Sequence, residues 1–151
     1  MYIDTRRFGR LDIDESKIIS FVNGLMGFET LKKYVIIDHP GSQVLKWLQS
    51  VDDPDISLPA ADPTAFFPDY SPSINREDLK SIGLDSIESA IILCIITVPA
   101  DIRKATINLK APVVLNPSRR LADQMIAENP EYKVRHPLPL AQKQEGRCAG
   151  C

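Results

Sequence analysis

The strongest strand signal of the chain is residues 88–98, ESAIILCIITV. This run contains four isoleucines and one valine, and β-branched side chains fit a pleated sheet better than they fit a helix. A half-buried strand alternates apolar and polar residues, whereas this run is apolar almost throughout, which indicates burial on both faces. We therefore expect a central strand, followed by a turn at Pro99.

Shorter strand signals surround this run at close spacing. Alternating or apolar residues predict strands over 34–37, 45–51, 56–61, 105–109, 112–115 and 132–136. The polar sequence DDPD at 52–55 favours a turn, so its two flanking strands should form a hairpin. A second hairpin is expected from residues 11–13 and 18–21, joined by a polar turn. This pattern predicts a mainly β fold, a small antiparallel β-barrel-like single domain closed to hide its edges.

Two or three short helices are expected beside the strands. Ser73 or Asn75 can cap a helix that continues to residue 82 and that Gly83 would end. A longer helix is predicted over residues 119–128, after a serine N-cap and before Asn-Pro, with apolar residues on one face. A single helical turn is expected within 28–33. Three prolines between residues 62 and 72 predict a loop there.

Length and charge limit the class of protein. The 151 residues suit one domain over 1–140, followed by a polar, aperiodic tail over 141–151 that is predicted to be disordered. Eighteen basic and twenty acidic side chains leave a formal charge of −2, which provides no field to hold nucleic acid. The N-terminus lacks the apolar stretch of a secretory signal, and no apolar run approaches the ~20 residues that span a bilayer. We expect a cytoplasmic protein that contacts neither nucleic acid nor membrane, and a monomer.

Residue patterns typical of catalysis or metal binding are weak. His39 and His136 each lack a second histidine or a carboxylate at ligand spacing, and there is no glycine-rich phosphate loop or serine nucleophile elbow. Cys148 and Cys151 have C-x-x-C spacing, but they supply two of the four ligands of a structural zinc. Cys94 is expected in the core. We therefore predict no enzyme, cofactor or metal site.

Charge segregation is the feature most informative about function. Between Trp47 and Asn75 the chain has five aspartates and neither lysine nor arginine. Aromatic residues accompany the aspartates, and large amphipathic side chains of this kind anchor protein interfaces. The segment is therefore a candidate docking surface. In the alternative interpretation, its aromatic side chains fill the core and its aspartates shape turns.

Six short motifs occur in order along the chain. They are FVNGLMGFE (21–29), WLQSVDDP (47–54), DP with FPDY (62–63 and 67–70), TVP (97–99), TINLKAPVVLN (106–116) and YKVRH (132–136). Together they resemble the FliW family of bacterial flagellar assembly factors over about residues 1–140, whereas the cysteine-containing tail lies outside the resemblance. The one departure is at residues 57–59, Ser-Leu-Pro, where a more apolar strand is expected.

The resemblance implies a compact β-barrel-like protein with two protein partners. One is the RNA-binding translational repressor CsrA, whose block on flagellin synthesis it would relieve, and the other is flagellin itself. Cytoplasmic flagellin would sequester the protein, and export of flagellin would free it to capture the repressor. The two partners could compete through overlapping surfaces or through allosteric coupling.

These partners suggest roles for the acidic, aromatic segment. An RNA-binding repressor should present a basic surface, so exposed aspartates are candidate electrostatic partners and large aromatic residues are candidate anchors. The candidate contact residues are Trp47, Asp52, Asp53, Asp55, Phe67, Asp69 and Tyr70.

Two other functions remain open from the residues alone. A barrel of many short strands is equally suited to enclose a small ligand, which a filled interior would argue against. A redox or metal-carrier protein built around Cys148 and Cys151 is the third interpretation, and it requires that the last four residues be needed for activity.

Overall fold

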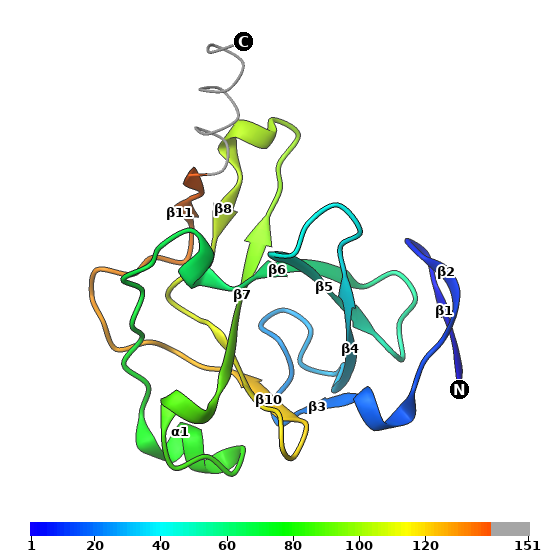
Figure 1. Cartoon of the computed structure of the whole chain (residues 1–151), viewed down its shortest axis with the longest axis horizontal. Helices are drawn as coiled ribbons and strands as arrows, with labels where there is room; N and C mark the ends of the chain where they lie inside the picture. Colours follow the sequence, from blue (N-terminus) through cyan, green and yellow to red (C-terminus); the bar gives the residue numbers. More distant parts are fainter. Residues whose placement is uncertain (140–151) are drawn as a thin grey trace.

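The computed structural model describes residues 1–139 and is built mainly of strands (Figure 1). The strands are β1 (Tyr2–Thr5), β2 (Gly9–Asp12), β3 (Ile19–Phe21), β4 (Lys33–Asp38), β5 (Leu45–Ser50), β6 (Ser57–Ala61), β7 (Ile91–Thr97), β8 (Thr106–Ile107), β9 (Val113–Asn116), β10 (Leu121–Gln124) and β11 (His136–Pro137). The helical elements are α1 (Arg76–Ser81) and the 3-10 turns η1 (Glu15–Lys17), η2 (Pro63–Ala65), η3 (Ile87–Ser89) and η4 (Ile102–Lys104). The mainly β fold is confirmed; the predicted tail lies outside the described residues.

Seven strands close into a barrel in the order β7, β6, β5, β4, β3, β10, β9 and back to β7. The barrel pairings are antiparallel except for the one between β3 and β10, which is parallel. Strands β8 and β11 extend the sheet from β7 beyond the barrel, and β1 and β2 form a separate hairpin (Figure 1). The expected closed barrel is confirmed, with one parallel pair added.

Strand β7 has the central position that its apolar sequence predicted. It pairs with β9 through residues 91–93, with β6 through residues 94–95 and with β8 through residues 96–97. Successive side chains of a strand point to opposite faces, and both Leu93 (5% exposed) and Cys94 (0%) are buried. This two-sided burial explains why the run is not alternating.

The barrel interior is filled with apolar side chains. Every barrel strand contributes at least one residue to a single buried cluster, whose strand members are Ile19, Phe21, Tyr34, Leu48, Ala60, Leu93, Val113, Leu115 and Ala122. The rings of Phe21 and Tyr34 meet edge to face with centroids 5.0 Å apart. A second cluster lies under the 62–72 loop, and a third includes residues of α1 and β9 together with Met125, which follows β10. Since side chains occupy the interior, the barrel does not resemble one that encloses a small ligand.

Helix α1 forms where the capping residues predicted it. The side chain of Asn75 accepts a hydrogen bond from the backbone N–H of Glu77 at 2.7 Å, which satisfies one of the free donors at the helix start. Gly83 follows the helix with a φ of +79°, a conformation that glycine adopts without strain. The helix buries Leu79 against the third cluster.

The helix predicted over 119–128 is wrong, because strand β10 lies there. Residues 121–124 pair antiparallel with β9 on one side, and residues 121–122 pair in parallel with β3 on the other. Arg120 has a φ of 52°, so the chain turns sharply at this residue instead of continuing a helix. The apolar spacing was compatible with a helix, but pairing on both edges decides the conformation.

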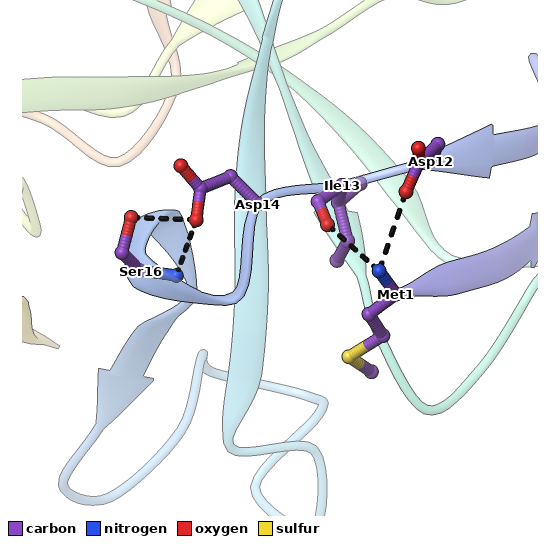
Figure 2. A network of polar contacts seen from close by, with 5 residues as sticks. All are labelled: Met1, Asp12, Ile13, Asp14 and Ser16. Atoms are coloured by element: carbon purple, nitrogen blue, oxygen red, sulfur yellow. Dashed lines mark hydrogen bonds and ion pairs between the residues drawn. The ribbon is translucent and has the colours of Figure 1, made fainter.

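The hairpin predicted from residues 11–13 and 18–21 is also wrong. Strand β2 pairs with β1, and the polar residues between β2 and β3 form the turn η1. Figure 2 shows the contacts around this turn: the N-terminal ammonium of Met1 donates to Asp12 Oδ1 (3.2 Å) and to the carbonyl of Ile13 (3.3 Å), and Asp14 Oδ1 accepts from the N–H and hydroxyl of Ser16 (2.9 and 2.7 Å). The partner strand, residues 2–5, was missed because four residues give little alternation to recognise.

Two smaller predictions need correction. Residues 28–33 form turns and the start of β4 instead of a helical turn, and Leu25 and Phe28 meet there in an isolated β-bridge. Of the strand predicted over 132–136, only His136 is extended and paired, as the first residue of the two-residue β11. The departure at residues 57–59 leaves the strand intact, because β6 pairs with β5 along its whole length.

Candidate functional site

The structure divides the seven candidate contact residues into two groups. The first group, Trp47 with the three aspartates of the 52–55 turn, lies on β5 and at the β5–β6 turn. The second group, Phe67, Asp69 and Tyr70, lies in the loop after β6 and lines one groove of about 430 Å³. The described contacts do not join the two groups, so they are two separate candidate surfaces.

Trp47 lies against the tip of the β1–β2 hairpin. The guanidinium carbon of Arg7 is 4.2 Å from the centroid of the indole, and the ring of Phe8 meets it edge to face at 6.0 Å. Arg6 joins the same hairpin to the β5–β6 turn, since its backbone N–H donates to the carbonyl of Pro54 at 2.9 Å. Trp47 is therefore half-buried on the outside of the barrel: the hairpin covers part of its side chain, and the rest is accessible to solvent.

The aspartates of the β5–β6 turn have different roles. Asp53 Oδ1 accepts from the backbone N–H of Asp55 at 3.0 Å, so this side chain shapes the turn. Asp52 and Asp55 are exposed, and the carboxylate of Asp55 is 4.0 Å from the guanidinium of Arg6. Both side chains of that ion pair are mostly exposed, so it contributes no more than about 1 kcal/mol. The turn therefore presents acidic groups that the protein itself neutralises weakly.

The groove of the second group has an aromatic wall. The ring of Phe67 meets that of His136 edge to face at 4.9 Å, and Tyr70 packs on Tyr132 at 4.7 Å. The carboxylate-bearing residues Asp69 and Glu131 also line the groove, and Asp69 is exposed.

Tyr70 is part of the protein's own core. Its side chain is 8% exposed, and its hydroxyl donates to the carbonyl of Leu109 at 2.8 Å. Burial, and then the neighbouring Cys94, raise the pKa of this phenol far above its ordinary value. The alternative interpretation, in which aromatic residues fill the core, therefore describes Tyr70 well, whereas Trp47 and Phe67 remain partly accessible.

Sequence reasoning missed the residues that complete each surface. Arg6, Arg7 and Phe8 reach Trp47 and the acidic turn only because the β1–β2 hairpin folds back on β5. Tyr132 and His136 reach the 62–72 loop from more than sixty residues away. The only sequence signal was their place in the YKVRH motif, which does not specify a contact.

The described residues contain neither a group of three or more His, Cys, Asp or Glu side chains arranged to hold a metal ion, nor a helix with the length and apolar character needed to cross a membrane. The Cys148–Cys151 pair lies beyond residue 139 and is not described.

Comparisons with known proteins agree with the fold and motifs. The family model described as FliW protein matches residues 2–138. The chain is 41% identical to the flagellar assembly factor FliW of Natranaerobius thermophilus over 139 residues, covering 91% of this chain and 92% of that protein. It is 43% identical to the FliW of Symbiobacterium thermophilum over 122 residues, covering 80% and 88%. A crystal structure of the flagellar assembly factor FliW superimposes with a TM-score of 0.83 at 29% identity, covering 91% of this chain and 96% of that chain. The chain therefore belongs to the FliW family of flagellar assembly factors.

Proposed function

We propose that this flagellar assembly factor works by binding the translational repressor CsrA and, separately, flagellin. The observation that carries the proposal is the match to the FliW family along nearly the whole described chain. Cytoplasmic flagellin would hold the protein until flagellin is exported, and the freed protein would then capture the repressor so that flagellin translation resumes. The protein would act in the cytoplasm by contact alone, as a regulatory protein and not as an enzyme.

The acidic β5–β6 turn supports a basic partner surface. Asp52 and Asp55 are exposed there, and Asp69 is a further exposed carboxylate on the second candidate surface, after β6. A repressor that binds RNA presents cationic side chains, which these carboxylates would attract during encounter. Because the contact between Asp55 and Arg6 is weak, a partner's cation can displace Arg6 at small cost.

Trp47 and Phe67 are the aromatic anchors in this proposal. Each is partly buried by the protein's own side chains, so each is already held in one orientation before a partner arrives. A rigid aromatic side chain loses little conformational entropy on binding, which is why such residues contribute strongly to interfaces.

The test is isothermal titration of the protein with purified CsrA and, separately, with flagellin, followed by displacement of each by the other. Saturable binding of both partners with mutual displacement is expected. The double variant Asp52→Lys/Asp55→Lys should bind the repressor at least about tenfold more weakly, because two attractive charges become repulsive. Asp53 stays unchanged in this variant because its side chain shapes the turn.

The matched control is Asp78→Lys/Asp85→Lys, which makes the same charge change at exposed positions on and after α1. The control should bind the repressor about as wild-type protein does. Equal weakening in both double variants would mean that net charge, and not the β5–β6 turn, governs binding. Absence of heat with either partner, confirmed by separate elution in gel filtration, would refute the proposed function.

A further inference from the structure

A groove of about 520 Å³ lies beside the first half of β7. Tyr70 lines it as well as the groove of the second candidate group. Residues 62–64, which include the start of η2, form one wall of this groove, and residues 90–93 form the other. Val44 and Lys46 also line it. The turn η2 packs beside β7, as Figure 1 shows where the chain leaves β6.

The groove exists because β6 ends early. Strand β6 pairs with β7 only through Ala60 with Ile95 and Ala61 with Cys94. The next residue, Asp62, caps η2, and Pro63 starts it. Proline has no backbone N–H and cannot continue the ladder, so the chain leaves β7 at this point.

The backbone of Ile92 faces the edge that β6 leaves open. The carbonyl of Ile95 accepts from the N–H of Asn108 at 2.9 Å, so the polar groups of Ile95 point to the edge shared by β8 and β9. Successive residues of a strand direct their backbone groups to opposite edges. Ile92, three residues earlier, therefore directs its N–H and carbonyl to the β6 edge, where the described residues place a groove and no strand.

The two charged side chains that line the groove, Lys46 and Asp62, already have polar partners within the protein. The ammonium of Lys46 pairs with Asp38 at 2.6 Å, and Asp62 Oδ1 accepts from the N–H and hydroxyl of Thr64 at 2.9 and 2.7 Å. The exposed side chain of Ile91 (46%) adds apolar surface at the rim. A charged segment would have to compete for these partners, whereas an uncharged one leaves the Lys46–Asp38 pair and the Asp62–Thr64 hydrogen bonds intact. Burying a charge without a dedicated partner is costly, so the groove favours an uncharged segment.

We propose that this groove binds an extended, uncharged, apolar segment of a protein partner by strand addition to β7. The added segment exchanges main-chain hydrogen bonds with Ile92, and its side chains pack against Ile91 and Val44. It takes the path that β6 would follow if Pro63 did not turn the chain away. This inference goes beyond the proposed function, because it holds whether or not the repressor or flagellin is a partner.

The test uses the blocked peptide acetyl-Ser-Val-Thr-Val-Thr-Val-Ser-amide as the probe, titrated into ¹⁵N-labelled protein and followed by NMR. The expected shifts are concentrated in residues 62–64 and 90–93. The amide of Ile92 should exchange with solvent rapidly in the free protein, unlike that of Leu93, and at least about tenfold more slowly with saturating peptide. The same peptide N-methylated at its central valine keeps its side chains but loses one donor, and it should bind about fivefold to tenfold more weakly.

The protein variant Ile92→Pro removes the N–H that faces the groove, and Ile92→Val is its matched control. Ile92→Pro should lose peptide binding while Ile92→Val keeps it. If Ile92→Pro does not fold, the comparison of the two peptides in wild-type protein decides. Protection of the Ile92 amide in the free protein, shifts centred elsewhere, or equal affinity of the two peptides would each overturn the proposal. Failure of CsrA and flagellin to bind would leave it standing, so the two proposals fail separately.

Discussion

Replacing Asp123 by alanine should destabilise the protein far more than replacing an exposed aspartate. Asp123 lies in β10 and is 5% exposed. Its Oδ1 accepts from the backbone N–H of Asn23 at 3.2 Å, and its Oδ2 accepts from the side-chain amide of Asn23 at 2.6 Å. These bonds join segments that are 100 residues apart in sequence, beside the parallel pairing of β10 with β3.

The expected loss for Asp123→Ala is about 3 kcal/mol in the free energy of unfolding. Hydrogen bonds to a charged group contribute about 1.5–3 kcal/mol each, and the alanine also leaves the donors of Asn23 without their acceptor. The lower end of the sum applies, because removing the carboxylate also relieves the cost of burying it. Asp123→Asn keeps an acceptor for one bond and should lose about half as much.

The assay is urea unfolding at pH 7, followed by fluorescence of Trp47, the single tryptophan of the chain. Asp85→Ala is the control, since Asp85 is exposed, and it should change stability by less than about 0.5 kcal/mol. A loss below about 1 kcal/mol for Asp123→Ala, with an unchanged denaturant slope, would refute the argument that this carboxylate holds the two segments together.

Gly24→Ala should cost at least about 2 kcal/mol in a thermal melt, because Gly24 has a φ of +80° and an added Cβ would lie 2.9 Å from backbone atoms of Glu29; Gly27→Ala, with a φ of +90° and open space, should cost about 1 kcal/mol. Tyr34→Phe should raise the free energy of unfolding by about 1 kcal/mol in urea, because it removes a buried hydroxyl that has no hydrogen-bond partner within residues 1–139. Stability should fall as pH rises from 9 to 12, because burial raises the pKa of Cys94 from 9.0 to about 12 and that of Tyr34 from 10.0 to about 12, so the unfolded chain loses these protons first. The urea midpoint should fall less steeply with pH in Tyr34→Phe than in wild-type protein. An equal slope in the two proteins would contradict the contribution of Tyr34 to this pH dependence.

Local patterns predicted those parts of the fold that depend on neighbouring residues. The β5–β6 hairpin follows from two strands around DDPD, and α1 follows from Asn75 at its start and Gly83 after its end. Strand β7 was predicted because two-sided burial produces an unbroken apolar run.

Elements that depend on distant partners could not be predicted in this way. The apolar residues of 119–128 suit one face of a helix, yet β9 and β3 pair with this segment and make it a strand. Asp123 lies within this predicted helix, whereas its hydrogen-bond partner Asn23 is 100 residues away in the sequence. Nothing within ten residues of Asp123 reports that contact.

The candidate site follows the same division. The acidic turn is local, so its aspartates were found from composition, and Asp53 indeed shapes that turn. The cover of Arg7 over Trp47 and the stacking of Tyr132 on Tyr70 join separate elements, so the sequence pattern could not place them. The groove beside Ile92 was also invisible, because it arises from a strand that stops early.

The parallel pairing of β3 with β10 also has a consequence for synthesis on the ribosome. Residues 20–21 cannot form this pairing before residues 121–122 have been synthesised. One edge of β3 therefore stays unpaired until four-fifths of the chain has been translated. Contacts of such long sequence separation slow folding, and an unpaired edge invites pairing with another chain. A nascent chain that stops before residue 121 is an open sheet with two free edges, so premature termination should yield aggregates instead of a smaller folded protein.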